Sequence, residues 1–196
     1  MATMGRPREF DVEEALDRAI EVFWLNGYEA ASIAELCEAM GIRPPSLYAA
    51  FGNKADLFRH AIDRYLEQKT RYVAEAFEAD TARETVETLV RGCADFLAEK
   101  GKPAGCLFMR SASAWGDEHG CVGQELAARR AEGETRLRTR LERAAAEGEL
   151  PPGIDPGELT QYVAAVLEGM SARAAAGASG AELRQIGEMA LRAWPR

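Results

Sequence analysis

Apolar residues recur at three- and four-residue intervals along most of this chain of 196 residues. That spacing is typical of helices that bury one face. In the first such stretch, Val12, Leu16, Ile20 and Phe23 fall on one side of a helix. No stretch alternates apolar and polar residues convincingly enough for a strand. The pattern therefore predicts an all-α protein of about nine helices.

Cap and turn residues mark the ends of the first three predicted helices. An acidic capping pair and an Asn-Gly stop bound the first helix. Ser32 and Glu35 form a capping box that begins the second, and Gly41 ends it. Pro44 and Pro45 follow, and prolines are tolerated there because they fall in the first turn of the third helix. Three helices in this arrangement are typical of a helix-turn-helix that binds DNA.

Beyond residue 53 the predicted helices are longer, and Gly- and Pro-rich loops separate them. They cover residues 54–79, 82–99, a short segment that begins near Cys106, 123–147, 156–176 and 181–194. The clearest linker is the Pro- and Gly-rich segment at 150–158.

The composition is typical of a folded globular protein, with 47% hydrophobic and 29% charged residues. No apolar run approaches the ~18 residues that span a bilayer. Residues 1–10 lack the apolar stretch of a signal peptide, so we expect a cytoplasmic protein. The net charge of −8 counts only weakly against nucleic-acid binding, because a DNA-binding protein needs no more than a local basic surface.

The cysteines Cys37, Cys93, Cys106 and Cys121 are widely spaced and include no Cys-x-x-Cys pair. This spacing argues against a structural zinc site and predicts four reduced thiols in the cytosol. The chain has two histidines, neither with a recognisable catalytic partner, which disfavours a small helical enzyme. We expect no catalytic residues, no metal and no cofactor.

A dense series of short motifs runs from Phe10 to Phe58. Asn-Gly-Tyr precedes the Ser32 cap, Ser-Leu-Tyr lies in the third helix, and Phe-Gly-Asn-Lys-Ala-Asp-Leu-Phe follows at 51–58. This series resembles the DNA-binding domain of the tetracycline repressor (TetR) family. The rest of the chain is similar to the family's ligand-binding and dimerisation half in general plan.

The resemblance implies a DNA-binding domain at 1–55 and a ligand-binding and dimerisation domain at 56–196. It further implies a homodimeric repressor that binds a palindromic operator and is released by a small apolar or aromatic effector. The alternative is a helical ligand-binding or scaffolding protein with weak or lost DNA binding. The acidic net charge favours that alternative, as does Ala49-Ala50, where many family members carry polar or basic residues.

Candidate DNA contacts cluster around the third helix. Arg43 at its N-terminus has the chemistry to donate two hydrogen bonds to guanine, and a solvated arginine is the alternative. Pro44, Pro45 and Leu47 offer apolar surface to thymine methyl groups, although Leu47 fits the core equally well. Hydroxyl groups and helix N-termini favour phosphates. They add Ser32, Ser46, Tyr48 and Lys54.

The N-terminal segment Gly-Arg-Pro-Arg at 5–8 resembles the core of an AT-hook. In such a hook an extended arginine enters a narrow minor groove. We therefore expect Arg6 and Arg8 to extend the DNA footprint, with an ordinary disordered terminus as the alternative.

Large apolar side chains of the middle helices are candidates for an effector pocket, although each also fits an ordinary core. They are Phe96, Cys106, Phe108, Met109, Trp115, Tyr162 and Met170. Cys106 begins a helix near Lys102, and both influences lower the pKa of a thiol. It is therefore a candidate sensor of electrophiles or oxidants, with a buried inert cysteine as the alternative.

The last two predicted helices carry small residues suited to close packing. The family resemblance implies that they pair with their mates as a four-helix bundle, whereas periodicity alone equally permits an intramolecular core. The interface candidates are Val163, Val166, Leu167, Gly169, Ala174, Leu183, Ile186, Gly187, Ala190 and Trp194.

Overall fold

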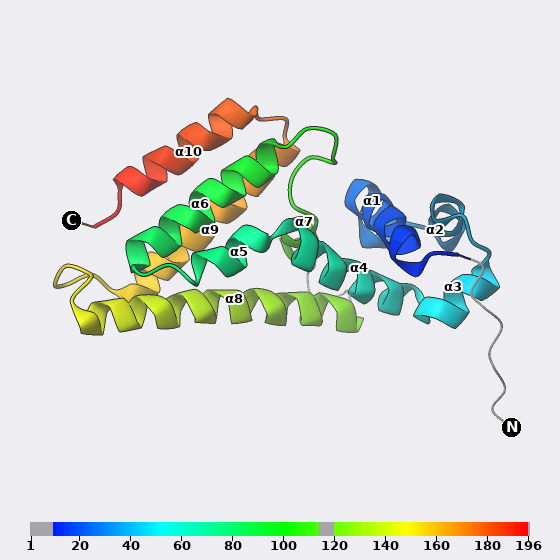
Figure 1. Ribbon diagram of the computed structural model, residues 1–196, viewed down its shortest axis with the longest axis horizontal. Coiled ribbons are helices and arrows are strands. Elements are labelled where there is room, and N and C mark those ends of the chain that lie inside the picture. The colour runs from blue at the N-terminus through cyan, green and yellow to red at the C-terminus, as the bar shows by residue number, and fades with distance from the viewer. Residues whose placement is uncertain (1–9, 114–119, 196) are drawn as a thin grey trace, which may run out of the picture. The chain divides into compact units, whose positions relative to one another are not determined.

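The structure, a computed structural model, describes residues 10–113 and 120–195. The described residues form helices and connecting loops without a strand, which confirms the all-α prediction (Figure 1). The helices are α1 (Val12–Ala30), α2 (Ile33–Met40), α3 (Pro44–Phe51), α4 (Lys54–Lys69), α5 (Arg71–Ala76), α6 (Ala82–Ala98), α7 (Leu107–Ser113), α8 (Gly120–Glu147), α9 (Pro156–Ala175) and α10 (Gly180–Arg192). No helix in these described ranges is long and apolar enough to cross a membrane.

The chain forms two compact units that divide between Tyr65 and Leu66, within α4. The N-terminal unit therefore extends past residue 55, where the sequence placed the domain boundary. The reason is that the apolar face of α4 belongs to its core, where the Phe58 ring lies edge-on to Phe23 at 4.9 Å and the Tyr65 ring edge-on to Trp24 at 5.0 Å.

One predicted helix is divided in the structure. The expectation of a single helix over 54–79 is wrong, because α4 ends at Lys69 and α5 begins at Arg71. Thr70 between them has φ −116° and ψ 32°, and its hydroxyl donates a hydrogen bond of 2.6 Å to the Leu66 carbonyl. A β-branched side chain that bonds back to the preceding turn weakens a helix. This break gives ten described helices where about nine were predicted.

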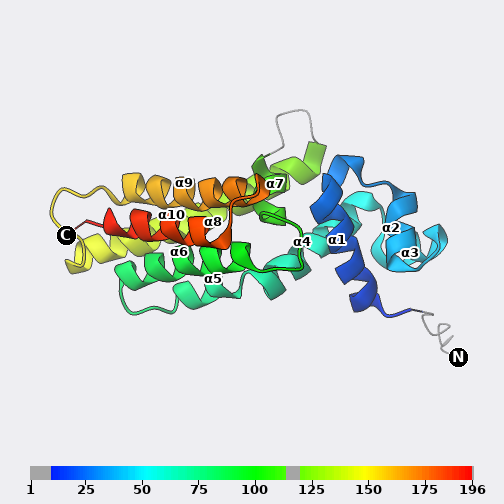
Figure 2. The same cartoon turned by 90° about the horizontal axis from the view of Figure 1, so that it is seen from above.

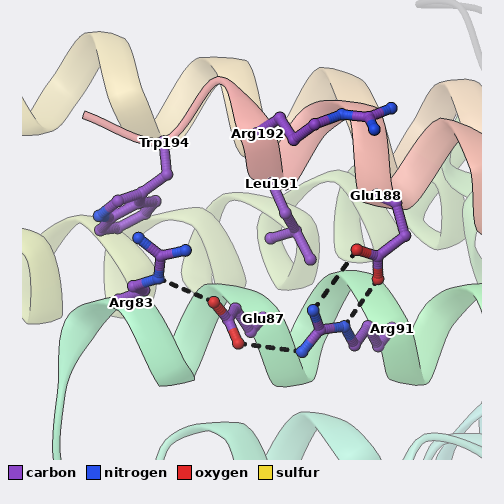
Figure 3. Close-up of a pocket in the computed structure, with 7 residues that line it drawn as sticks. All are labelled: Arg83, Glu87, Arg91, Glu188, Leu191, Arg192 and Trp194. Atoms are coloured by element: carbon purple, nitrogen blue, oxygen red, sulfur yellow. Dashed lines mark hydrogen bonds and ion pairs between the residues drawn. The ribbon is translucent and has the colours of Figure 1, made fainter. Parts of the chain in front are cut away.

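In the C-terminal unit, α6 packs against α5, α9 and α10, and α8 packs against α7 and α9 (Figure 2). Close approach of α10 to α6 needs a small residue, because a Cβ at Gly187 would lie 3.0 Å from a Val90 methyl group. Ion pairs follow the same contact. Figure 3 shows Arg91 of α6 joined to Glu87 at 3.0 Å and to Glu188 of α10 at 2.8 Å.

A buried arginine ties the end of α8 to the start of α6. Arg140 donates a hydrogen bond of 3.0 Å to the Asp80 carbonyl and pairs with Glu149 at 3.3 Å. Glu149 also accepts a hydrogen bond of 2.5 Å from the backbone N–H of Ala82, in the first turn of α6. The Ala82 donor and the Arg140 guanidinium hold the pKa of Glu149 below its ordinary value.

Candidate nucleic-acid interface and effector cavity

The turn between α2 and α3 follows from its cap residues. Ser32 and Glu35 form the predicted capping box, with a hydrogen bond of 3.1 Å from the Glu35 N–H to the Ser32 hydroxyl. Gly41 ends α2 with φ 67°, a left-handed conformation that glycine adopts without strain. Arg43 is then extended, and Pro44 opens α3. The predicted helix, glycine turn and helix are confirmed.

The solvent-facing side of α3 carries little polar chemistry. Pro44, Pro45, Tyr48 and Ala49 are exposed, with 51% of Tyr48 accessible. Arg43, also exposed, has no side-chain cap bond and makes no ion pair with a residue that the structure describes. A guanidinium without an internal partner retains its donors for an external acceptor.

Leu47 differs from its neighbours on α3 because its side chain is fully buried. The prediction that it offers apolar surface to thymine is therefore wrong, and the core alternative is confirmed. The helical period decides this outcome, since Leu47 and Phe51 lie one turn apart on the inner side while Tyr48 faces solvent. Ser46 is half-buried.

Lys54 and Ser32 both have roles within the N-terminal unit. The Lys54 ammonium donates to the Glu29 carbonyl at 3.2 Å and lies 4.6 Å from the centre of the Tyr28 ring. The Ser32 hydroxyl donates to the Glu35 carboxylate at 2.8 Å. Their predicted phosphate contacts stay predictions, and Arg6 and Arg8 lie outside the described residues.

A cavity of about 620 Å³ lies inside the C-terminal unit. Its size suits a small molecule, since ligand pockets span about 300–1,000 Å³. The predicted effector residues that it brings together are Phe96, Cys106, Phe108 and Met109. Sequence reasoning missed several others that border it, namely Tyr72, Phe77, Cys93, Arg129, Arg130, Arg136 and Leu137. The arginine-rich amphipathic pattern of α8 was the available signal, but it does not show which side meets a cavity.

Two of the predicted effector residues do not border this cavity. Met170 is fully buried in the helix packing. Tyr162 is 41% exposed on α9, and its hydroxyl donates a hydrogen bond of 3.3 Å to the Ala190 carbonyl of α10. A third, Trp115, lies outside the described residues.

Two family models match these two parts of the chain. The model described as bacterial regulatory proteins, tetR family, matches residues 15–61, and the tetracyclin repressor-like C-terminal domain matches residues 82–189. The HTH-type transcriptional repressor ComR of Escherichia coli strain K12 is 37% identical over 97% of this chain and 92% of its own length. The chain belongs to the TetR family. This family consists of DNA-binding regulatory proteins and not of enzymes, in agreement with the prediction of no catalytic residues.

Solved structures of TetR regulators share the fold. A cysteine-substituted variant of the TetR family regulator CifR, solved with double-strand operator DNA, is 44% identical, with a TM-score of 0.89 over 97% of this chain and all of that chain. A TetR regulator from Rhodococcus sp. RHA1 is 38% identical, with a TM-score of 0.64 over 94% of this chain and all of that chain.

The cavity in the C-terminal unit contains two thiols beside a tyrosine. Cys93 and Cys106 both border it, as does Tyr72, and neither cysteine forms a disulfide. Burial raises the pKa of Cys93 to about 12, and the neighbouring Cys106 adds to this shift. Cys93 is therefore protonated and weakly nucleophilic near neutral pH. Cys106 is itself buried, and its backbone N–H donates to the Ser171 hydroxyl at 3.1 Å.

Several TetR dimer candidates pack inside the chain instead of facing outward. Val163, Ala174, Leu183, Gly187 and Trp194 are buried within the described part of the protomer. We expected these residues on a surface that contacts a second copy of the chain. That expectation is wrong for them, because they face the protomer core, where α9 and α10 pack against α6. Leu167 borders the cavity. Other residues of α9 and α10 remain accessible, including Tyr162, Val166, Gly169, Ile186, Met189 and Ala190.

Proposed function

We propose that this TetR protein is a repressor that binds a palindromic operator as a homodimer and leaves it when a small effector with an apolar or aromatic body fills the cavity. The observation that carries the proposal is the exposed Arg43 at the N-terminus of α3. Its guanidinium forms no ion pair with any residue that the structure describes. The relatives support it, since ComR and BdcR of Escherichia coli are both described as repressors and the CifR variant was solved with operator DNA.

The candidate DNA contacts have distinct roles in this proposal. Arg43 reads a guanine by two hydrogen bonds, and Pro44 and Pro45 contact thymine methyl groups. Phosphate contacts hold the helix in register. They come from Ser32, Ser46, Tyr48 and Lys54, while Arg6 and Arg8 enter the neighbouring minor groove.

The accessible side of α9 and α10 supports the homodimer. Met189 is 63% exposed and, with Ile186, forms an apolar patch on α10, while Gly169 on α9 has no heavy atom near the place of a Cβ. Small and apolar residues allow two helix pairs to pack as a four-helix bundle. A twofold dimer requires an inverted-repeat operator, with recognition helices on the order of 34–36 Å apart or a bent equivalent.

Substitution of Gly169 tests the dimer. In Gly169→Arg a large charged side chain enters the proposed interface, and its Cβ meets no heavy atom within 4 Å in the described protomer. We expect sedimentation to show a monomer and operator binding to be lost. Thr139→Arg on exposed α8 is the matched control and stays dimeric. A dimeric Gly169→Arg protein would contradict this use of α9.

The effector acts through α4 in this proposal. That helix is continuous from Lys54 to Lys69, and Leu66 in its last turn borders the cavity. A ligand that displaces Leu66 shifts α4 and changes the separation of the two recognition helices. DNA and effector then favour different conformers, so each weakens the binding of the other by the same factor.

The decisive experiment is selection of bound sites from random DNA, followed by gel shifts with the selected sequence. A repressor of this kind selects an inverted repeat, and its affinity falls steeply as salt rises. Absence of any selected sequence at low salt would leave the helical scaffolding protein as the correct assignment.

A further inference from the structure

Three arginines of α8 belong to the lining of the effector cavity, and the charged part of this lining is called the rim. Two of them are neutralised within the protein. Arg129 pairs with Glu125 at 3.5 Å, and Arg130 pairs with both Glu134 at 3.0 Å and Glu168. These guanidinium groups are therefore held by carboxylates of the chain itself.

Arg136, the third arginine of the rim, is held differently. Its guanidinium carbon lies 3.9 Å from the centre of the Phe77 ring, and Phe77 is itself part of the cavity wall. It makes no ion pair within the described ranges. Stacking on a ring uses the face of the guanidinium and leaves the N–H groups at its edge available, in a fork that matches a carboxylate.

The remaining wall of the cavity is largely apolar. Phe96, Phe108, Met109 and Leu137 border it together with the Phe77 ring under Arg136. An apolar body and a single anionic group therefore match the two parts of the cavity. A purely apolar ligand leaves the Arg136 donors to water.

Glu132 is the other charged group of the rim without an ion pair in the described part of the chain. It lies one turn before Arg136 on α8, yet the two do not form an ion pair. Phe77 places the Arg136 guanidinium at the cavity wall. A cation fixed at that place favours an anionic group on the ligand.

We infer that the effector is an amphipathic carboxylate, with its apolar body in the cavity and its carboxylate on Arg136. This inference rests on the proposed function in one respect, that the cavity is the effector site. It adds a charge requirement and names Arg136 as the residue that sets it.

Displacement of a neutral fluorescent probe, N-phenyl-1-naphthylamine, tests the inference. Decanoate, decanol and decylamine share one apolar body and differ in charge. We expect decanoate to bind the full-length protein about tenfold more tightly than decanol, the size of one charge-assisted contact. The preference falls as salt rises, because Arg136 is exposed.

Two variants locate the preference. Arg136→Gln loses it while decanol binds unchanged. Arg138→Gln removes the same charge from an exposed residue that pairs with Glu142, and it keeps the preference. Equal binding of decanoate and decanol, preference for decylamine, a preference retained in Arg136→Gln, or no displacement by any of the three would overturn the inference.

Operator release measured in the same samples separates the two proposals. Decanoate that binds through Arg136 without releasing DNA supports the ligand class and overturns effector control. Decanol that binds as well as decanoate and releases DNA supports effector control and overturns the ligand class.

Discussion

The two compact units use their aromatic residues in opposite ways. In the N-terminal unit, Phe23, Phe58 and Tyr65 are fully buried and pack ring against ring. In the C-terminal unit, Phe77 and Phe108 border a cavity of about 620 Å³. The first arrangement fixes the backbone that presents α3. The second leaves a space of a size that suits a small molecule.

The largest expected effect is the difference in stability loss when an aromatic ring is truncated in each unit. Phe58→Ala removes a side chain with no exposed surface, and we expect a loss of about 3–5 kcal/mol in the free energy of unfolding. Phe108→Ala, at the half-exposed cavity wall, should cost about 1 kcal/mol, because fewer packing contacts are lost. Urea denaturation followed by circular dichroism measures both. Equal losses in the two variants would contradict this difference between the units.

Arg43→Ala tests whether the N-terminal unit binds DNA through a specific contact of Arg43. Loss of a bidentate contact to guanine should weaken binding to the selected operator by about 1–3 kcal/mol, or roughly five- to 150-fold, without change in stability. Arg143→Ala removes the same charge from α8, where Arg143 pairs with Glu147, and should leave the affinity unchanged. Gel-shift titration at constant salt distinguishes them. A similar loss in both variants would show a general charge effect.

Glu149→Gln tests how firmly the helices around the cavity are held. We expect a loss of about 1–2 kcal/mol in unfolding free energy at neutral pH, because a charged acceptor for Ala82 and Arg140 becomes neutral. Glu147→Gln, at an exposed i,i+4 pair, is the control.

The pH dependence of the same residue has a definite sign. The folded-state pKa of Glu149 lies below the ordinary 4.5, so its contribution is complete above pH 4.5 and is lost as the pH falls through the folded value. The stability difference between the wild-type protein and Glu149→Gln should therefore shrink in acid. A constant difference across this range would contradict the assignment.

The smallest expected effect concerns the apolar surface of α3. Replacement of a contacted thymine by uracil removes one methyl group and preserves every hydrogen bond. We expect a loss of about 0.8 kcal/mol, or about fourfold in affinity, at each position that Pro44 or Pro45 covers. Gel shifts with single substitutions along the half-site measure it. Uniform affinity at all positions would show that these prolines do not contact thymine.

Local motifs predicted much of the fold. The Ser32 capping box and the Gly41 turn are confirmed, and Asp155 caps α9 by accepting from the N–H groups of Gly157 and Glu158. Ser179 with Glu182 is a further capping box, and its Ser-x-x-Glu spacing was available in the sequence. Thr70 had no comparable signal, because a threonine inside a helix most often causes no break.

The site was less predictable than the helices. Arg43 and Tyr48 are exposed as expected, since a short helix on a defined turn has one inner side. The effector and dimer candidates do not share one environment, because some are buried in the core, some border the cavity and some are exposed. Met170 and Leu183 are core, Tyr162 is on the surface, and Arg136, which is not apolar, borders the cavity.

The family, the helical fold and the position of the recognition helix follow from local sequence patterns, because caps, turns and periodicity act over a few residues. Which side of α8, α9 and α10 meets the core, the cavity or solvent depends on how the whole chain packs. A helix with apolar residues on more than one side has several possible partners, and packing of the remaining chain selects among them.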